Sequence, residues 1–306
     1  MYRKEGRKTL KNGYVHKKRV TTPYILIFPA VVFMAVFMAY PLLRVFVLSL
    51  QRNNPSKPYL NGFIGLGNFI ELFHTSQFYQ ALANSFKWVI LEVVLQLVFG
   101  MAIALLLNKK FKGRGLVRTL TFIPWALSGV LTAVIWSLIY NQHMGVLNDM
   151  LMRAGLIDKG IAWTGNRGVV FGAVALAELW RGIPFFAITL LAAMQNISGE
   201  LYEAANVDGS NAFQKLLYIT LPLLKETIVL TTLLRAVWEF NSVDLIYSLT
   251  GGGPAGMTTT LSMYIADQAI RTSNYGYGSS ISVVSFLILS VFAIIYMKCT
   301  NFGKDS

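Results

Sequence analysis

Six long apolar runs restrict what this chain can fold into more than any other feature of its sequence. Each run has about 17 or more mostly apolar residues, the length at which a helix crosses the hydrocarbon core of a bilayer. The runs are continuous rather than alternating, which argues against a transmembrane barrel. We therefore predict an all-α integral membrane protein with six transmembrane helices. The predicted spans cover about 24–48, 86–107, 120–140, 169–194, 227–249 and 280–297.

Basic residues flank the apolar runs unevenly and predict how the helices are oriented. Eight Lys or Arg residues precede Pro23, and five lie between Lys109 and Arg118. Lys215 and Lys225 add to the same side of the membrane, whereas the segments on the other side carry fewer basic residues. The positive-inside rule then places both termini in the cytoplasm. We expect cytoplasmic tails at 1–23 and 299–306 around a single transmembrane domain at 24–298.

The composition argues against an enzyme and against a nucleic-acid binder. Of 306 residues, 55% are hydrophobic and 13% are charged, and the net charge of +13 lies beside the apolar runs. Topology explains that charge, so membrane lipid is an expected partner and nucleic acid is not. The single cysteine and the three histidines lack the spacing of a metal site. Without a P-loop motif or a catalytic constellation, we expect no catalytic residue, no metal and no cofactor bound by this chain.

The stretch from Ser198 to Pro222 separates the fourth and fifth runs and is too polar to cross a bilayer. Ser198 is placed to cap a short helix that Gly209 then ends. Asn211, followed by Gln214, matches a capping box and restarts a second helix. The pattern predicts a helix, a glycine turn and a second helix.

This stretch also matches a known motif in its spacing. Glu203-Ala204-Ala205, Asp208-Gly209 and Leu221-Pro222 together resemble the EAA loop of ABC-importer permeases. The resemblance implies a MalF-like, type I importer fold, in which residues 198–222 form a cytoplasmic coupling helix docked on an ATPase subunit. The alternative is an ordinary capped helical hairpin on the membrane surface. The resemblance assigns coupling to the ATPase to Glu203, Ala204, Ala205, Asp208, Gly209, Leu221 and Pro222.

Further motifs are similar to those of the carbohydrate-uptake permeases, and most similar to the MalF-type half with six spans. They are the runs from Trp180 to Pro184, from Glu200 to Ala205, from Phe240 to Tyr247 and from Leu249 to Pro254. The resemblance implies transport of a sugar, oligosaccharide or sugar derivative by alternating access across a bacterial or archaeal cytoplasmic membrane. It implies a MalG-type second permease in a heterodimer, an ATPase dimer that holds ATP and Mg, and an extracytoplasmic solute-binding protein.

The fourth and fifth spans carry charged side chains, each of which costs about 2.5–3.5 kcal/mol at a helix centre and needs a partner or water. Glu178 and Arg181 are three residues apart and share a helical face, and Arg235, Glu239 and Ser242 follow i, i+4, i+7 spacing. Two interpretations are open: these groups line a solute cavity, or they neutralise one another and hold the helices together. The residues assigned to a solute pathway are Glu178, Arg181, Phe185, Arg235, Glu239 and Ser242.

Glu92 and Gln96 on the second span are expected to serve only packing between helices, with no other polar group converging on them. The alternative function for the whole chain is a secondary, ion-coupled transporter that uses the buried Glu/Arg pairs. Such a transporter would work without an ATPase.

Overall fold

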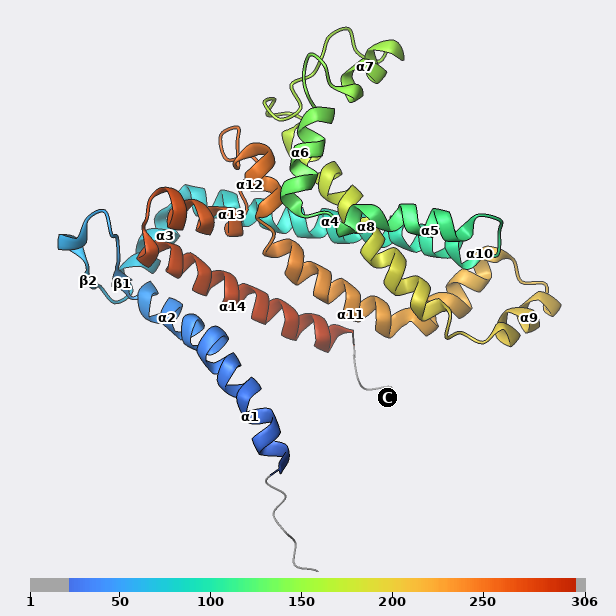
Figure 1. Ribbon diagram of the computed structural model, residues 1–306, viewed down its shortest axis with the longest axis horizontal. Coiled ribbons are helices and arrows are strands. Elements are labelled where there is room, and N and C mark those ends of the chain that lie inside the picture. Colours follow the sequence, from blue (N-terminus) through green and yellow to red (C-terminus); the bar gives the residue numbers. More distant parts are fainter. Residues whose placement is uncertain (1–21, 301–306) are drawn as a thin grey trace, which may run out of the picture. The chain divides into compact units, whose positions relative to one another are not determined.

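The computed structural model describes residues 22–300 (Figure 1). The predicted cytoplasmic tails fall almost entirely on residues 1–21 and 301–306, outside the described part of the chain. Contacts divide the chain into two units, Met1–Arg44 and Val45–Ser306, and each is considered by itself.

The first unit is helical in its described part. Helix α1 (Thr22–Met34) continues through the π-helical segment η1 (Ala35–Ala39) into α2 (Tyr40–Ser49). Tyr24–Ser49 has the length and composition of a membrane span, and no residue in its most apolar window is buried within the chain. Pro29 lies inside α1 without ending it.

The second unit contains the remaining helices and one small hairpin. Strands β1 (Gln51–Arg52) and β2 (Gly62–Phe63) pair antiparallel, with Gln51 opposite Phe63. The helices before residue 165 are η2 (Pro58–Leu60), α3 (Gly67–His74), α4 (Ser76–Asn108), α5 (Arg114–Phe122), η3 (Ile123–Ala126), α6 (Gly129–Ile139) and α7 (Val146–Arg153). The later helices are α8 (Val170–Met194), α9 (Gly199–Val207), α10 (Ala212–Lys215), η4 (Leu216–Thr220), α11 (Leu221–Phe240), α12 (Asp244–Thr250), α13 (Leu261–Ala266), η5 (Asp267–Arg271) and α14 (Tyr275–Cys299).

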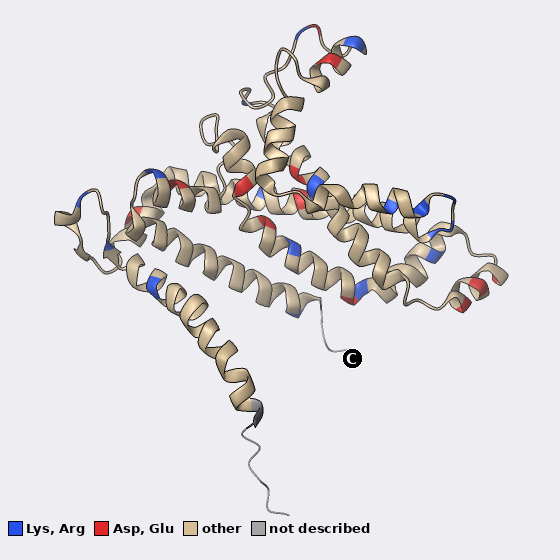
Figure 2. Cartoon of the chain, viewed as in Figure 1, with Lys and Arg blue, Asp and Glu red and all other residues tan. Residues whose placement is uncertain are grey.

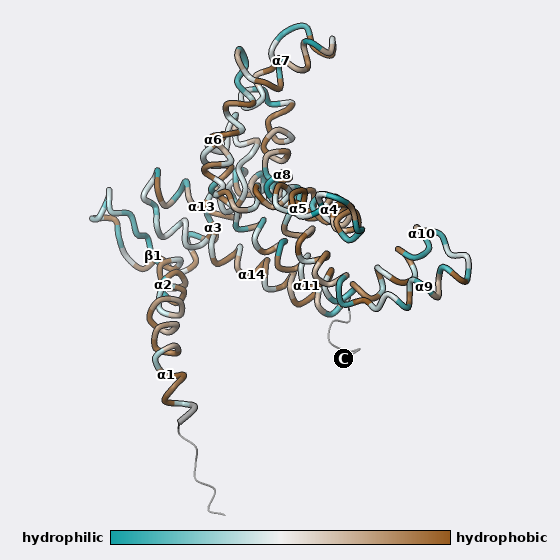
Figure 3. The backbone as a smooth tube through the Cα atoms, turned by 45° about the vertical axis from the view of Figure 1, so that its right-hand side comes forward, coloured by the Kyte–Doolittle hydropathy of each residue, from teal (hydrophilic) through white to brown (hydrophobic). Residues whose placement is uncertain are grey.

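Five helices among the described residues are long and apolar enough to cross a membrane, and a bent pair makes up to six. They are Tyr24–Ser49, Ser76–Asn108, Val170–Met194, Ala212–Phe240 and Tyr275–Cys299. The all-helical membrane fold predicted from the apolar runs is therefore confirmed. Figure 3 shows apolar residues along most of these helices, and more hydrophilic residues around α9 and α10.

The third predicted span, 120–140, is not one straight helix. The structure places Arg114–Ala126 and Gly129–Ile139 at 102° to each other. The chain breaks because Leu127 and Ser128 are extended, and the Ser128 side chain accepts a hydrogen bond from the Leu131 N–H at 3.2 Å to start α6. A capping side chain after an extended pair ends one helix and begins another.

The fifth predicted span, 227–249, is also displaced. The helix begins at Ala212, runs through the π-helical segment η4 and ends at Phe240. Residues 241–243 then leave the helix, and α12 starts separately. The second arm of the predicted coupling hairpin is thus the first part of the fifth membrane helix.

Helices α4 and α8 pack most extensively against each other, and α11 contacts both. Gly100 permits this approach, because a Cβ there would lie 2.5 Å from the Phe186 Cβ. Leu107, Phe186 and Leu190 are fully buried at this contact. The three helices therefore form a packed group around the polar site.

Candidate functional site

Buried charged side chains from α4, α8 and α11 meet in one network. Glu178 on α8 is completely buried, and its carboxylate accepts hydrogen bonds from Arg181 Nε and Nη2, both at 2.9 Å. The i, i+3 spacing places both side chains on one face, as the sequence predicted. Two parallel bonds from one guanidinium edge are a strong and directional contact.

Arg235 on α11 joins this pair to its own helix. Its Nη2 lies 2.9 Å from Glu178 Oε1 and 2.6 Å from Glu239 Oε1. Its guanidinium carbon also lies 5.9 Å from the centre of the Phe185 ring, and Phe185 packs on Trp238 with ring centres 5.2 Å apart. Arg235 therefore bridges α8 and α11 with its charge already paired.

Gln96 corrects the expectation that α4 would lie apart from these charges. Its carbonyl accepts a hydrogen bond from Arg235 Nε at 2.6 Å, and its amide donates to Glu239 Oε1 and to Glu92 Oε2, each at 2.9 Å. Trp88, one more residue of α4, donates its indole N–H to Glu239 Oε2 at 2.9 Å. Residues on α4 thus complete the network, because α4 packs directly on α8 and brings its polar face inward.

Within residues 22–300 the network holds more carboxyl groups than guanidinium groups. Glu92, Glu178 and Glu239 are all at most 2% exposed, and only Arg181 and Arg235 oppose them. Glu92 Oε1 is buried and has no hydrogen-bond partner in this part of the chain. The same residues contain no cluster suited to a metal ion.

Gly182 makes room for the network. A Cβ at this position would lie 2.3 Å from the Gln96 side-chain amide and 2.5 Å from Arg235 Nη2. Both atoms are held by hydrogen bonds, so they cannot move without breaking the contacts described above. The sequence offered Gly182 only as part of a motif, and its clearance role follows from the packing of α4 on α8.

We expect Gly182→Ala to destabilise the protein, because the added methyl group displaces Gln96 and Arg235. Overpacking of this kind costs about 1–3 kcal/mol, more than the roughly 1 kcal/mol that Ala gains over Gly in a helix. Gly172→Ala is the matched control, since a Cβ at Gly172, on the same helix, meets nothing within 4 Å. The melting temperature of the purified protein should fall for Gly182→Ala and stay level or rise for Gly172→Ala. Equal melting temperatures for the two variants would contradict the clearance role.

A cavity of about 440 Å³ opens beside the network. Its walls are Trp125, Glu178, Arg181, Arg235, Trp238, Glu239, Asn241, Ser242 and Asp244. Trp125 and Trp238 are each close to half exposed, at 47% and 44%. The cavity combines aromatic faces with hydrogen-bonding groups, the combination that suits a polar, ring-shaped solute.

Two of the residues assigned to the pathway lie differently from the prediction. Ser242 does not continue the Arg235–Glu239 stripe, because α11 ends at Phe240; the residue lines the cavity, and its Oγ is buried without a hydrogen-bond partner within residues 22–300. Phe185 is 7% exposed and packs under Arg235 instead of lining the cavity. Sequence reasoning missed Trp125 and Asn241, which the helix breaks at 127–128 and 241–243 bring to the cavity.

Asp244 fixes the helix breaks beside the cavity. Its carboxylate accepts from the Gly129 N–H at 2.9 Å and from the Leu245 N–H at 3.0 Å, so it lies at the first turns of both α6 and α12. Gly129 has to be Gly, because a Cβ there would lie 2.1 Å from Asp244 Oδ2. A carboxylate at a helix N-terminus is favoured by the helix dipole.

The predicted helix, glycine turn and helix are present at residues 198–215. The Ser198 side chain accepts from the Glu200 N–H at 3.3 Å, and Asn211 with Gln214 forms the expected capping box. Gly209 has φ +76°, a value that residues with a Cβ rarely adopt. Local capping and turn chemistry therefore determine this loop.

Two side-chain contacts anchor the loop to the membrane helices. The Tyr202 hydroxyl lies 2.9 Å from the Thr220 hydroxyl, and the Lys215 ammonium donates to the Asn206 side chain. Leu221 and Pro222 form the first turn of α11, directly after Thr220. These contacts join α9 to the start of the helix that continues into α11.

The loop presents a mixed surface to the solvent. Glu203, Ala204 and Asp208 are exposed, whereas Ala205 is buried within the chain and does not face outward. Val207 is 89% exposed, which makes it one of the most exposed large apolar side chains in the described residues. The sequence feature that could have identified Val207 is its position between the polar residues Asn206 and Asp208.

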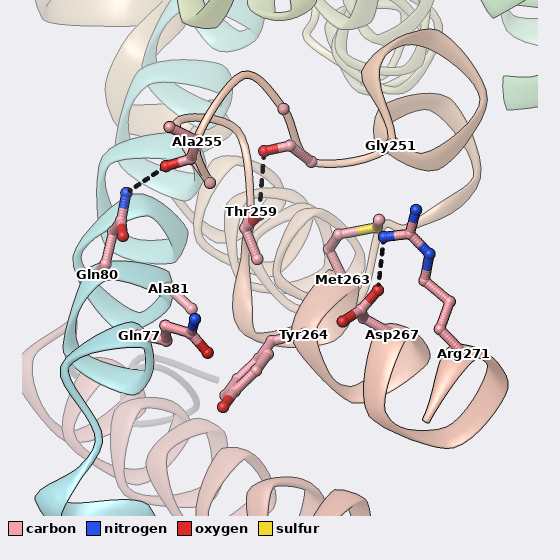
Figure 4. Close-up of a pocket in the computed structure, with 13 residues that line it drawn as sticks. Gln77, Gln80, Ala81, Gly251, Ala255, Thr259, Met263, Tyr264, Asp267 and Arg271 are labelled. Carbon is pink, nitrogen blue, oxygen red and sulfur yellow. Dashed lines mark hydrogen bonds and ion pairs between the residues drawn. The ribbon is translucent and has the colours of Figure 1, made fainter. Parts of the chain in front are cut away.

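A second, smaller cavity of about 260 Å³ lies where α4 meets the loop after α12 and the helix α13 (Figure 4). Gln80 donates to the Ala255 carbonyl at 3.3 Å, and Thr259 donates to the Gly252 carbonyl at 3.0 Å. The pair Arg271–Asp267, at 2.9 Å, lines the same cavity. The lining residues Gln77 and Gln80 belong to the first turns of α4, whereas α9 and α10 lie toward the other end of that helix (Figure 1).

Comparisons with known proteins give a consistent result. The family described as "Binding-protein-dependent transport system inner membrane component" matches residues 96–299. The trehalose/maltose transport system permease protein MalF of Thermococcus litoralis is 35% identical over 285 residues, covering 92% of this chain and 94% of that protein. The sulfoquinovosyl glycerol transport system permease protein SmoG of Agrobacterium fabrum is 33% identical over 279 residues, covering 90% and 88%.

A solved structure shares the fold. It is a bacterial alginate ABC transporter in complex with an alginate pentasaccharide-bound periplasmic protein, and its matching chain superimposes with a TM-score of 0.81 at 23% identity. The match covers 94% of this chain and 97% of that one.

Proposed function

The chain belongs to the binding-protein-dependent transport system inner membrane components, and from this premise we propose that it forms one half of the pathway through which an ATP-driven importer moves a sugar, oligosaccharide or sugar derivative. It is a multi-pass inner-membrane permease and a non-catalytic subunit. In such transporters the ATPase is a separate component.

The cavity of about 440 Å³ is the single observation that carries the proposed pathway. Trp125 and Trp238 offer aromatic faces to a sugar ring, and Arg181 and Asn241 offer hydrogen-bonding groups to its hydroxyls. The named solutes of the similar permeases, trehalose, maltose and sulfoquinovosyl glycerol, are all rich in hydroxyl groups. Glu178, Arg235 and Glu239 also line this cavity, but Arg235 already forms ion pairs with both carboxylates.

We propose the partners that the family resemblance implies and assign two of them to the two ends of the bundle. We assign the exposed Glu203, Asp208 and Val207 to contact with an ATPase subunit, whose dimer holds ATP and Mg. A MalG-type second permease supplies the other half of the pathway. We assign the opposite end, with the cavity at Gln80 and Thr259, to contact with an extracytoplasmic solute-binding protein. The distribution of basic residues supports a cytoplasmic location for both termini and the coupling loop.

The network explains how movement of the loop reaches the cavity. Helix α8 leads into the loop and α11 leaves it, and Arg235 on α11 holds these two helices together through its ion pair with Glu178 on α8. Closure of the ATPase subunits on ATP displaces the loop, and α8 and α11 move as a pair beside the cavity. Alternating access results from binding energy that favours one conformation over the other.

We expect uptake in proteoliposomes that contain both permeases and the ATPase to require ATP inside and the solute-binding protein outside. Radiolabelled maltose and trehalose are the probes, because similar permeases carry these solutes. Collapse of the proton and sodium gradients with ionophores should leave uptake unchanged. Uptake that persists without ATP and stops with ionophores would establish the secondary transporter instead.

A further inference from the structure

Two arginines on α5, Arg114 and Arg118, have buried side-chain nitrogen atoms without a hydrogen-bond partner in the described part of the chain. The Nε and Nη2 atoms of Arg118 and the Nε atom of Arg114 are buried and have no hydrogen-bond partner among residues 22–300. Neither side chain forms an ion pair within this part of the chain, and the sequence has no Asp or Glu between Glu92 and Asp149. Buried, unpaired N–H groups of a charged side chain are costly, so an anionic group from outside the chain is needed to complete this site.

The unpaired atoms of Arg118 form one edge of its guanidinium group. Arg181 uses the same two atoms, Nε and Nη2, to hold both oxygens of Glu178. This edge matches two oxygens of a carboxylate or a phosphate in a bidentate contact. The ligand therefore carries at least two oxygens on one centre.

Arg118 lies in a pocket of about 160 Å³ between α5 and α8. Phe122, Ile188 and Leu191 form its apolar wall, and Gln195 provides a second polar group. A pocket with one polar end and one apolar wall suits an amphiphilic ligand. A small hydrated ion has no apolar part that could pack against that wall.

The surroundings of the pocket place it at the cytoplasmic surface of the bilayer. Residues 109–118 carry five basic residues, and Figure 2 shows them on α5 and on the loop that joins it to α4. The pocket lies beside the last turns of α8, next to the coupling loop. Basic pockets between helices on this side of a membrane bind anionic head groups.

We propose that Arg118, with Gln195, binds the phosphate of an anionic phospholipid from the cytoplasmic leaflet, whose acyl chain lies along Phe122, Ile188 and Leu191. The cytoplasmic placement rests on the proposed orientation of the permease; the binding itself does not depend on transport. Arg114 lies one helical turn earlier on α5 and does not line the pocket.

The test is lipid retention by the purified complex in detergent, measured by native mass spectrometry during titration with phosphatidylglycerol. We expect Arg118→Gln to weaken retention about tenfold, because one charge-assisted contact of roughly 1.4 kcal/mol or more is lost. Lys112→Gln is the matched control: it removes the same charge from the same basic segment but does not line the pocket. Arg118→Lys keeps the charge without the bidentate edge and should lie between the two.

Equal loss in Lys112→Gln and Arg118→Gln would show diffuse attraction to the basic segment and overturn the site. Unchanged retention in Arg118→Gln would do the same. Release of the lipid by millimolar inorganic phosphate would assign the pocket to a soluble anion. If Arg118→Gln loses the second permease while lipid retention is unaffected, a carboxylate of that subunit is the true partner.

If Arg118→Gln does not fold, Arg118→Lys carries the test alone, and wild-type retention in it overturns the bidentate contact. Because lipid retention is measured without solute or ATP, these outcomes are independent of whether the chain transports sugar.

Discussion

Replacing Arg235 with Met should destabilise the permease strongly and abolish uptake. Arg235 is 6% exposed and contacts Glu178, Glu239 and Gln96, so its removal leaves two buried carboxylates without their shared cation. Breaking a buried ion pair in this way costs about 3–5 kcal/mol. The measurement is thermal unfolding of the detergent-solubilised protein, followed by uptake in proteoliposomes.

Arg153→Met provides the control for a lost arginine charge. Arg153 pairs with Asp149 at 2.9 Å, but its side chain is 79% exposed, and exposed pairs contribute about 0–1 kcal/mol. Adding Glu239→Gln to Arg235→Met should recover part of the lost stability, because Glu178 keeps its pair with Arg181 and the carboxylate left without a cation is that of Glu239. A melting temperature that drops no further for Arg235→Met than for Arg153→Met would show that the network does not stabilise the bundle.

Gly209→Pro should separate the permease from its ATPase and stop uptake while leaving the membrane helices folded. Proline requires φ near −65°, whereas Gly209 has φ +76° and donates its N–H to the Asn206 carbonyl at 3.1 Å. The turn between α9 and α10 cannot form with proline there, so Glu203 and Asp208 lose their placement. Co-purification of the ATPase with the tagged permease is the measurement.

Gly199→Pro is a matched control in the same loop. Gly199 is the first residue of α9, a position at which proline is well tolerated, and a Cβ there meets nothing within 4 Å. The preceding Ser198 has φ −60° and ψ 133°, which a following proline accepts. We expect this variant to keep the ATPase. Retention of the ATPase by Gly209→Pro, or its loss from both variants, would count against the coupling role of the turn.

The all-helical membrane fold could be predicted because a span needs only length and apolar composition, which are local properties of the sequence. The capped turn at residues 198–215 was predictable for a similar reason: Ser198, Gly209 and Asn211 act on their own neighbours. The i, i+3 proximity of Glu178 and Arg181 likewise depends on one helix alone.

Contacts between helices could not be predicted in this way. Periodicity shows which residues share a face of α4, but not that this face meets Arg235; the approach of α4 to α8 depends on Gly100 and Gly182. The start of α6 after the 102° bend at 127–128 is capped by Asp244, which comes from a distant part of the sequence. Trp125 and Asn241 reach the cavity only through the helix breaks at 127–128 and 241–243.

The continuous helix from Ala212 to Phe240 joins the loop at residues 198–215 directly to the buried charge network. At 1.5 Å per residue, its path from Ala212 to Arg235 is roughly 35 Å long. A tilt of only a few degrees at the loop therefore moves Arg235 by an ångström or more, beyond the tolerance of its hydrogen bonds. When the loop moves, the network must either move together with α11 or lose its hydrogen bonds and ion pairs. Because its charges are buried and paired, moving together costs less free energy. The contacts that rearrange must then lie outside the network, between α4, α8 and α11 and their surroundings.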